Sequence, residues 1–320
     1  MFNKITFLLL FLVLTTCDKK INNSENSSRI KAVSKTSLVI LGTAQDAGYP
    51  QIGCTKSCCI NKWNGKKSTL VTSIGVIEPK EKKTYLFEAT PDIKFQIKEL
   101  SSYIDNNSIQ LPNGIFLTHA HIGHYTGLME LGREAINAKN IQVFSMPRMF
   151  KYLSSNGPWN QLVELGNIDL KPISNNIEIS ISSNLKITPF IVPHREEYTE
   201  TVGYKIKGPH KTALFIPDID KWEKWKISIE DEIKKVDYAF LDATFYKNGE
   251  VGNRDMSEIP HPFVEESFKR LKNMTSNDKS KVYFIHFNHT NPLLQKNSKA
   301  QNEVINLGFN FAKEGLIFEL

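Results

Sequence analysis

The sequence lacks clusters of basic residues, although 40 Lys and Arg against 34 Asp and Glu give it a formal net charge of +6. The surplus is spread along the chain, so the charge pattern does not indicate a nucleic-acid-binding protein. From Leu38 onward the sequence also lacks internal repeats and low-complexity stretches. With 40% hydrophobic and 10% aromatic residues, the composition is that of a folded globular protein and excludes a wholly disordered chain.

The chain begins with an apolar run that is too short to span a membrane. This run extends from Ile5 to Leu14 with one interruption, whereas a spanning helix needs ~20 apolar residues. One positive charge precedes the run and a polar stretch follows it, which is the outline of a secretory signal. Residues 14–17 (Leu-Thr-Thr-Cys) resemble the end of a bacterial lipoprotein signal, with Thr16 where that pattern prefers Gly, Ala or Ser.

We therefore expect a signal peptide over residues 1–16 and a lipid on Cys17, with an uncleaved hydrophobic anchor as the alternative. Residues 17–36 are rich in Asn, Ser and Lys and nearly free of apolar side chains, which predicts a flexible tether. The expected location is the cell envelope, with the protein anchored by lipid to a bacterial membrane and facing the periplasm or the exterior.

Residues 37–320 contain no linker and predict a single domain. Short runs rich in Val, Ile, Phe and Tyr, bounded by Gly, Pro or Asn, predict strands. These runs are residues 38–41, 70–77, 84–87, 114–118, 185–192, 202–206, 212–216, 236–242 and 281–287. Segments with helical periodicity are residues 91–104, 124–138, 147–155, 220–235, 262–273 and 298–307. This succession predicts an α/β fold in which helices cover two mixed sheets.

Three of the eight histidines lie within six residues, directly after an apolar strand. The stretch Gly114-Ile-Phe-Leu-Thr-His119-Ala-His121 continues through Ile-Gly to His124. A strand that turns into a helix can aim all three side chains at one point. Neutral imidazole is the commonest metal ligand in proteins, and zinc prefers nitrogen and sulfur donors. The cluster therefore predicts a metal site.

This stretch resembles the His-x-His-x-Asp-His signature of the metallo-β-lactamase fold superfamily. The resemblance extends over nearly all of residues 38–320 and points to the subgroup around the pyrroloquinoline-quinone biosynthesis protein B. Further stretches that carry it are residues 41–50, 192–203, 215–220, 241–245 and 284–292. It implies a four-layer αββα sandwich with two mixed sheets.

The resemblance also implies a metal centre with two positions. Its implied ligands are His119, His121 and His194 for the first position, His124 and His286 for the second, and Asp218 as a bridge between them. The chain departs from the signature at Gly123, where the superfamily normally has an Asp that ligates the second metal. Glycine offers no donor, so the alternatives are a mononuclear site or a second position completed by another residue such as His261. The quinone-biosynthesis proteins depart from the signature at its second histidine instead.

The three cysteines after Cys17 lie within six residues of each other, at positions 54, 58 and 59. An odd number is awkward for disulfides outside the cytoplasm, and adjacent cysteines cannot pair without strain. Three thiolates and a histidine make a closed structural zinc site. The related cyclic phosphodiesterase of phosphonate breakdown has such a site, whose histidine lies three residues after a catalytic one. By this resemblance the ligands are Cys54, Cys58, Cys59 and His289, and the alternative is a disulfide between Cys54 and one neighbour.

Three polar residues outside the ligand set are candidates for other roles. Asp46, in a loop after the first strand, either acts as a general base or orients the metal-bound water, or it only caps a turn. Arg195 either holds an anionic group of the substrate or pairs with Glu196 or Glu197. Asp242, at a strand end, is a candidate for fixing the tautomer of a ligand histidine.

The leading hypothesis is a zinc-dependent hydrolase that cleaves an ester, amide, lactone or phosphodiester in a small-molecule substrate. Zinc lowers the pKa of bound water toward ~7 and polarises the scissile group. One or two zinc ions are expected at the histidines and one at the cysteines, with Asp46, Asp218 and Arg195 as candidate catalytic residues. The alternatives are a binding or accessory protein for a quinone cofactor or its precursor, and an oxidative enzyme with iron.

Overall fold

The computed structural model describes residues 32–65, 68–104, 109–252 and 255–320. The expected signal peptide, Cys17 and most of the expected tether lie outside these residues. Within residues 32–36, Lys35 pairs with Glu319 at 2.8 Å, and the Thr36 hydroxyl donates to a Glu78 carboxylate oxygen at 2.9 Å. Among the described residues, no helix has the length and apolar character needed to cross a membrane.

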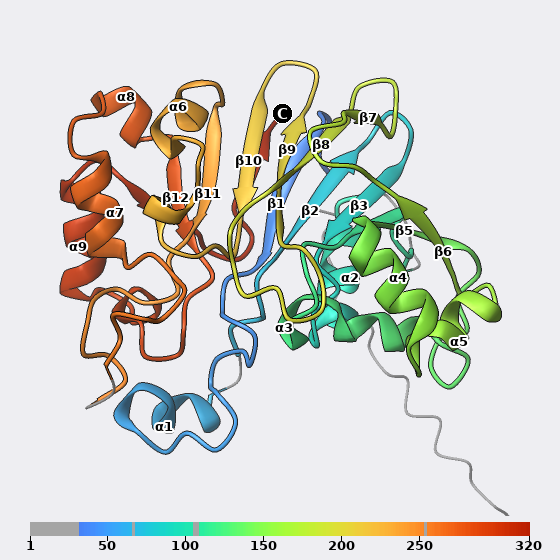
Figure 1. Cartoon of the computed structure of the whole chain (residues 1–320), viewed down its shortest axis with the longest axis horizontal. Helices are drawn as coiled ribbons and strands as arrows, with labels where there is room; N and C mark the ends of the chain where they lie inside the picture. Colours follow the sequence, from blue (N-terminus) through green and yellow to red (C-terminus); the bar gives the residue numbers. More distant parts are fainter. Residues whose placement is uncertain (1–31, 66–67, 105–108, 253–254) are drawn as a thin grey trace, which may run out of the picture.

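Two seven-stranded sheets form the centre of the domain (Figure 1). The first sheet has the order β14 (Ile317–Glu319), β1 (Ser37–Gly42), β2 (Ser73–Glu78), β3 (Lys83–Phe87), β4 (Gly114–Phe116), β5 (Ile141–Ser145) and β6 (Ile168–Pro172). The second sheet has the order β13 (Asn310–Phe311), β12 (Val282–Ile285), β11 (Tyr238–Asp242), β10 (Thr212–Ile216), β9 (Val202–Lys207), β8 (Lys186–Ile191) and β7 (Ile179–Ser180). Both sheets are mixed, as the sequence predicts, because β3 to β6 and β10 to β13 pair in parallel and the other neighbours are antiparallel.

Helices cover the outer faces of both sheets. The α-helices are α1 (Ser57–Trp63), α2 (Ile93–Ser101), α3 (Ile122–Tyr125), α4 (Pro147–Ser155), α5 (Trp159–Glu164), α6 (Ile229–Lys234), α7 (Val264–Leu271), α8 (Ser276–Lys279) and α9 (Lys299–Asn306). The 3-10 helices are η1 (Thr126–Leu131), η2 (Trp222–Lys224) and η3 (Pro292–Leu294). Figure 1 shows α2, α4 and α5 on the side of the first sheet and α6, α7 and α9 on the side of the second. The four-layer αββα sandwich is thus confirmed.

Alternation along the strands creates three apolar layers. On β1, Leu38 and Ile40 face the second sheet and join its inward residues in a core between the sheets. Their neighbours Val39 and Leu41 face the other way and pack with α2, η1, α4 and α5. The outer face of the second sheet packs in the same manner on α6, α7 and α9. A period of two is what a strand needs when both of its faces are buried.

Two expected helices are shorter than predicted. The segment 124–138 forms α3 and η1 and then continues as turns after Leu131. Within η1, Gly127 lies against the backbone, where a Cβ would be 2.0 Å from the Thr90 carbonyl oxygen. The segment 220–235 divides into η2 and α6, since Ser228 starts a new helix by accepting a hydrogen bond from the Asp231 backbone N–H. The strands β5, β6, β7, β13 and β14 were not expected.

The candidate site residues lie at one edge of the sandwich because several strands run in the same direction. In each sheet, alternate antiparallel strands restore the direction, so β1 and β8 end at the same edge as the parallel strands of their sheets. A parallel bridge between Ala44 and Phe287 joins the ends of β1 and β12 across the two sheets. The loops that follow β1, β4, β8, β10 and β12 therefore meet, at the lower edge in Figure 1.

The stacked aromatic rings between the sheets should dominate the stability of this fold. Phe116 is fully buried and stacks on Phe87 and Phe144, with ring centroids 4.8 and 4.4 Å apart. Replacing it by alanine should lower the free energy of unfolding by about 3–5 kcal/mol, measured by urea denaturation at constant zinc concentration. As a control, Phe95→Ala removes a ring that is 52% exposed and should change it by no more than about 0.5 kcal/mol. Equal losses in both variants would contradict this account of the core.

Candidate metal centre

The first group of candidate ligands converges where β4, β8 and β10 end. His119, His121, His194 and Asp218 offer ligand atoms that all lie within 4.8 Å of one another. His119 Nε2 is 2.8 Å from His121 Nδ1 and 3.4 Å from Asp218 Oδ2, and His194 Nε2 is 3.3 Å from Asp218 Oδ1. Donor atoms around a tetrahedral zinc with Zn–N bonds of 2.0–2.1 Å lie roughly 3.4 Å apart. The observed spacing suits such an ion.

The second group lies beside the first. His124, on α3, and His286, directly after β12, share with Asp46 ligand atoms that lie within 4.8 Å of one another. The His124 Nε2 atom is 3.7 Å from Asp218 Oδ2. Asp218 thus lies between the two groups, as the resemblance implies for a bridging carboxylate. The structure brings together all six residues that the resemblance names as ligands.

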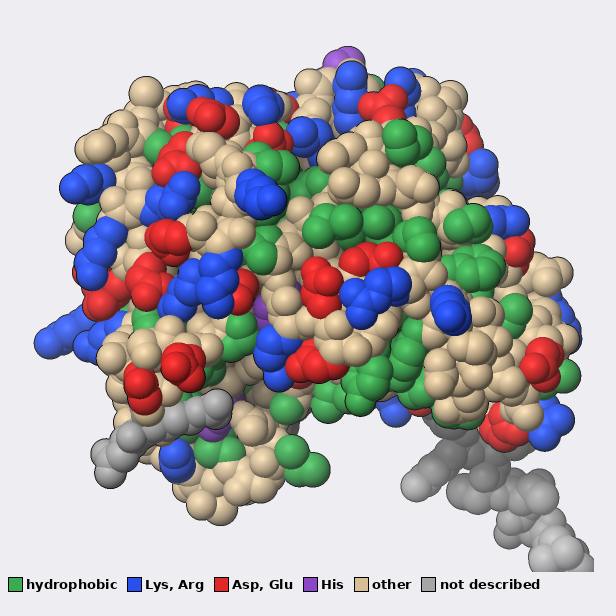
Figure 2. All heavy atoms as spheres, viewed as in Figure 1, with side chains coloured by type: hydrophobic (Ala, Val, Ile, Leu, Met, Phe, Trp, Pro, Cys, Tyr) green, Lys and Arg blue, Asp and Glu red, His purple; other side chains and the backbone are tan. Residues whose placement is uncertain are grey.

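Several of these ligand atoms are buried without a hydrogen-bond partner. Among the described residues they include His124 Nε2, His194 Nε2, His286 Nε2, Asp46 Oδ1 and Asp218 Oδ1. Buried polar atoms in proteins are almost always satisfied, and a cluster of unsatisfied imidazole nitrogens and carboxylate oxygens that face each other suits a cation. The residues of the centre therefore fit the zinc ions that the fold implies. On the face shown in Figure 2 little histidine is visible, in keeping with this burial.

A buried carboxylate and a threonine fix the tautomer of His119. The Thr118 hydroxyl donates to Glu88 Oε1 at 2.6 Å, so its oxygen accepts the proton of His119 Nδ1, 2.9 Å away. This leaves His119 Nε2 unprotonated and directed at the centre. Glu88 Oε1 also lies 3.2 Å from His124 Nδ1, which directs His124 Nε2 to the centre in the same way. Such partners orient metal-binding histidines and raise their basicity.

The second sheet repeats this arrangement at His286. The Thr244 hydroxyl donates to Asp242 Oδ1 at 2.7 Å and lies 2.9 Å from His286 Nδ1. Asp242 therefore acts on a ligand histidine through Thr244, while its other oxygen, Oδ2, lies 2.9 Å from His261 Nδ1. Asp242 was predicted from the sequence for such a role, whereas Glu88, Thr118 and Thr244 were not. The one signal for these three was their place at strand ends: Glu88 directly follows a predicted strand, Thr118 is the last residue of one, and Thr244 lies two residues beyond one.

The backbone is strained at two of these positions. Glu88 has a φ angle of 79° and His286 a φ angle of 69°, in the left-handed region that side chains other than glycine seldom adopt. Each such residue costs roughly 1–3 kcal/mol and persists where its surroundings determine it. Here the strain lies at one metal ligand and at the carboxylate behind two others.

Burial sets the protonation of the first group. It lowers the pKa of His194 to about 4 and, with the neighbouring His124, holds the pKa of His119 well below its usual value. Burial opposes the charge on Asp218, but His194 and His261 outweigh this effect and hold the pKa of Asp218 well below its usual range. The histidines are therefore neutral and the aspartate ionised at neutral pH, which are the forms that bind metal.

Arg195 lies at the solvent-exposed rim of the centre. It is 54% exposed, and its Nη1 is 3.6 Å from Glu197 Oε1. Glu197 in turn lies 3.2 Å from His121 Nε2 through its other oxygen. Of the two readings of Arg195, the structure shows the ion pair with Glu197, whereas Glu196 lies 3.2 Å from Arg148. An anionic substrate group would have to compete with Glu197 for Arg195.

The three cysteines and His289 form a separate cluster at α1. Cys54 Sγ is 3.8 Å from Cys58 Sγ, and His289 Nδ1 is 3.6 Å from Cys58 Sγ and 3.4 Å from Cys59 Sγ. Around a tetrahedral zinc with Zn–S bonds of about 2.3 Å, sulfur atoms lie roughly 3.8 Å apart and sulfur and nitrogen roughly 3.6 Å apart. The thiols are free, so the alternative of a Cys54 disulfide is not formed.

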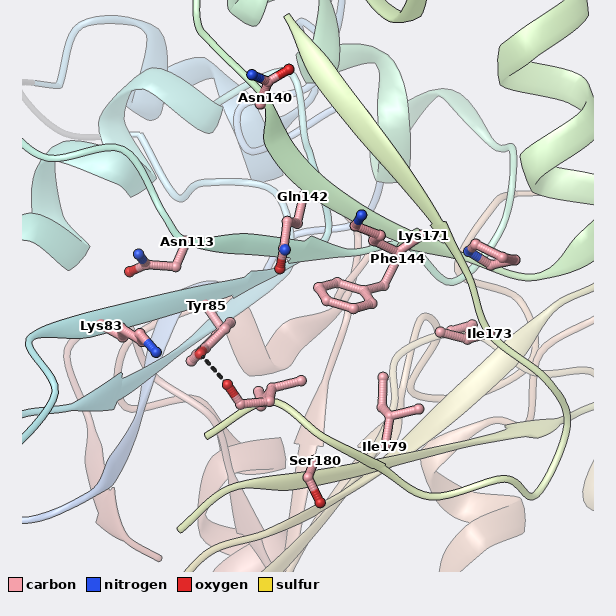
Figure 3. Close-up of a pocket in the computed structure, with 12 residues that line it drawn as sticks. Lys83, Tyr85, Asn113, Asn140, Gln142, Phe144, Lys171, Ile173, Ile179 and Ser180 are labelled. Atoms are coloured by element: carbon pink, nitrogen blue, oxygen red, sulfur yellow. Dashed lines mark hydrogen bonds between the residues drawn. The ribbon is translucent and has the colours of Figure 1, made fainter. Parts of the chain in front are cut away.

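A cavity of about 600 Å³ lies away from both clusters (Figure 3). It is lined by side chains from β3, β5, β6 and β7, among them Tyr85, whose hydroxyl donates to the Ile181 carbonyl oxygen at 2.8 Å. Lys83 and Asn113, at the starts of β3 and β4, also line it. These strand starts are opposite to the ends that lead to the histidines, and none of the candidate ligands lines this cavity.

Comparison with known proteins agrees with this geometry. A model of the beta-lactamase superfamily domain matches residues 83–287. Coenzyme PQQ synthesis protein B of Gluconobacter oxydans (strain 621H) is 24% identical over 315 residues, which cover 88% of this chain and 98% of that protein.

Two solved structures resemble the whole domain. The crystal structure of Zn²⁺-bound PqqB from Methylobacterium extorquens matches with a TM-score of 0.75 and 23% identity, covering 89% of this chain and 100% of that one. A diphosphatase from the PhnP family matches with a TM-score of 0.64 and 20% identity, covering 89% and 97% of the two chains. With a domain model that matches more than half of its length and a sandwich shared with both structures, this chain belongs to the beta-lactamase superfamily and has the metallo-β-lactamase fold.

Proposed function

We propose that this protein is a zinc-dependent hydrolase that acts on an ester, amide, lactone or phosphodiester of a small-molecule substrate. The observation that carries the proposal is the convergence of buried imidazole and carboxylate atoms that lack hydrogen-bond partners. Zinc bound there lowers the pKa of water toward ~7 and polarises a carbonyl or phosphoryl oxygen. The similarity to a diphosphatase of the same fold supports hydrolysis, but the substrate follows from the site and not from the fold.

The residues of the centre have two proposed roles: some bind the metal ions, and others fix the protonation of the metal ligands. His119, His121 and His194 with Asp218 hold the first metal position, and His124 and His286 contribute to the second. Glu88 and Asp242, through Thr118 and Thr244, keep the ligand nitrogens free of protons. The proposed metal ligands lie at strand ends and in the first turn of α3, so the fold fixes their positions before a substrate binds.

His261 is the proposed general acid. It is 5% exposed, and its Nδ1 lies 2.9 Å from Asp242 Oδ2 and 3.1 Å from Asp218 Oδ1. Burial opposes its protonation, but Asp242 and Asp218 outweigh burial and raise the pKa of His261 to about 10. Since Nδ1 is held by carboxylates, Nε2 is the ring atom that can donate a proton to a leaving group.

The alternative function is a binding or accessory protein that handles a quinone cofactor or its precursor without hydrolysis. The similarity to coenzyme PQQ synthesis protein B over 88% of the chain favours it. Binding of pyrroloquinoline quinone in a calorimeter, with no turnover across a panel of esters, lactones and phosphodiesters, would replace the hydrolase proposal with this one.

Two further proposals concern the cysteine cluster and the N-terminus. Cys54, Cys58, Cys59 and His289 have the spacing of a closed structural zinc site. The signal-like residues 1–16 and Cys17 support a lipid-anchored protein of the bacterial cell envelope.

Removing ligands from the first metal position should abolish turnover. His121→Ala combined with His194→Ala takes away two of its three imidazoles, so zinc per chain should fall and hydrolysis should drop below detection. Zinc is measured by mass spectrometry and turnover on the substrate panel. His210→Ala is the matched control, because His210 is exposed and lies in none of the ligand groups. Unchanged turnover in the double variant would overturn the hydrolase proposal.

Replacing His261 should separate catalysis from metal binding. His261→Ala is expected to lower kcat by about 10²–10⁴-fold, the usual contribution of a general acid, while zinc per chain stays the same. The kcat–pH profile should lose its alkaline limb, because that limb reports loss of the donated proton. A variant that loses zinc as well would make His261 a metal ligand instead of an acid.

Replacing the two adjacent cysteines should remove one zinc ion and leave zinc bound at the histidine centre. Cys58→Ser with Cys59→Ser keeps the side-chain size but removes two thiolates, so zinc per chain should fall by one and the thermal midpoint should fall with it. The histidine variant described above serves as the reciprocal control. Wild-type zinc content in the cysteine variant would contradict a structural site.

A further inference from the structure

Asp46 occupies the space beside Gly123, in the middle of the histidine motif. A Cβ built on Gly123 would lie 2.4 Å from Asp46 Oδ1 and 2.5 Å from Asp46 Cα, closer than any real side chain can approach. Gly123 lies within α3, between His121 and His124. Any other residue at position 123 would therefore push Asp46 out of the centre.

The Asp46 carboxylate faces two imidazole nitrogens without bonding to either. Its Oδ1 lies 3.0 Å from His124 Nε2 and 3.6 Å from His286 Nε2, yet none of these three buried atoms has a hydrogen-bond partner among the described residues. The ligand atoms of Asp46, His124 and His286 all lie within 4.8 Å of one another, close enough to share one metal ion. The spacing brackets the roughly 3.4 Å expected around one zinc ion.

The backbone holds Asp46 to the element that carries His286. The preceding Gln45 donates its N–H to the Phe287 carbonyl oxygen at 2.8 Å, and Asn288 Nδ2 donates to Gln45 Oε1 at 2.6 Å. Ala44 forms parallel bridges to both Val71 and Phe287. The carboxylate and the His286 ring are thus fixed relative to each other by main-chain contacts.

We propose that Asp46 is a ligand of the second metal position and supplies the carboxylate that Gly123 lacks. The glycine and the aspartate then form one compensated pair, in which the missing side chain at 123 makes room for the carboxylate from the loop after β1. His261 is grouped with Asp218, Asp242 and His286 and not with His124, and its Nδ1 lies 2.9 Å from Asp242 Oδ2 and 3.1 Å from Asp218 Oδ1, so Asp46 is the carboxylate that faces both His124 and His286. Asp46 Oδ1 caps no turn, because this buried atom accepts no hydrogen bond from the described residues.

This inference rests on metal binding at the centre, which the proposed function also requires, but not on hydrolysis. Zinc counts and turnover therefore test the two separately. If the zinc counts behave as described below and no substrate of the panel is cleaved, the inference stands and the hydrolase proposal fails.

The test is zinc per chain in the purified full-length protein and its variants, by mass spectrometry after dialysis against a fixed free-zinc buffer. Asp46→Asn preserves shape and removes the charge, and Asp46→Ala removes the donor. Both should hold one zinc ion fewer than the wild type, with the alanine variant requiring at least tenfold more free zinc to regain it. Gly123→Ala should lose the same ion because its Cβ displaces Asp46.

Asp220→Asn is the matched control. Asp220 lies two residues after Asp218 but pairs with Lys224 at 2.7 Å, so this variant should keep the wild-type zinc count.

Cobalt substitution shows which ion is lost. The thiolate-to-cobalt charge-transfer band reports the cysteine cluster and should be unchanged in the Asp46 variants, while the visible bands of the histidine centre should weaken. Wild-type zinc counts in both Asp46 variants, or a wild type with a single ion at the histidines, would overturn the assignment. Circular dichroism spectra that match the wild type establish that each variant is folded before its metal content is read.

Discussion

The structure depends on an electrostatic constraint at one edge of the sandwich, where four carboxylates lie among six imidazoles. Glu88, Asp218 and Asp242 are almost fully buried, and Asp46 is largely so. Isolated buried carboxylates are costly, so positive charge has to be present among them. Without a metal, the imidazoles supply it: burial opposes protonation of His124, but Glu88 and Asp46 raise its pKa well above the usual value. A divalent cation meets the same demand while leaving the ring nitrogens as ligands.

Two threonines connect the buried carboxylates to histidines of the centre. Glu88 reaches His124 Nδ1 directly, at 3.2 Å, but at two other histidines a hydroxyl between the carboxylate and the ring fixes the tautomer. Thr118 and Thr244 do this in the two sheets, each donating to a buried acid and each within 2.9 Å of a histidine Nδ1. The strained backbone at Glu88 is the cost of placing one carboxylate behind two ligands.

The sequence indicated which polar side chains converge at the centre better than it indicated what surrounds them. His119, His121 and His124 follow a strongly apolar strand, and the spacing alone indicated a metal site. Most strands that lead to the site were also predicted, because buried parallel strands appear in the sequence as continuous apolar runs. Glu88 was missed because an isolated acid after a strand has no pattern of its own.

The place of Asp46 beside Gly123 could not be predicted from the sequence. A glycine in the motif shows only that a donor is missing, and not which distant side chain fills its space. That relationship exists only in three dimensions, 77 residues apart in the chain. The helix expected over residues 124–138 is shorter than predicted, for a similar reason. The sequence of this segment has helical periodicity. A local pattern does not contain tertiary features, such as the close approach of Gly127 to the Thr90 carbonyl oxygen or the turns that follow η1.

The two clusters of candidate ligands are joined through the chain segments that carry them. The segment after β1 carries Asp46 and then Cys54, and the segment after β12 carries His286 and then His289. A metal that binds the cysteines and His289 therefore ties together the two segments that supply the second position of the histidine centre. The bridge between Ala44 and Phe287 fixes the near ends of these segments, and the cysteine cluster fixes their far ends. A zinc ion at the cysteines would thus do more than hold α1 in place, because it would also limit how far Asp46 can move from His286.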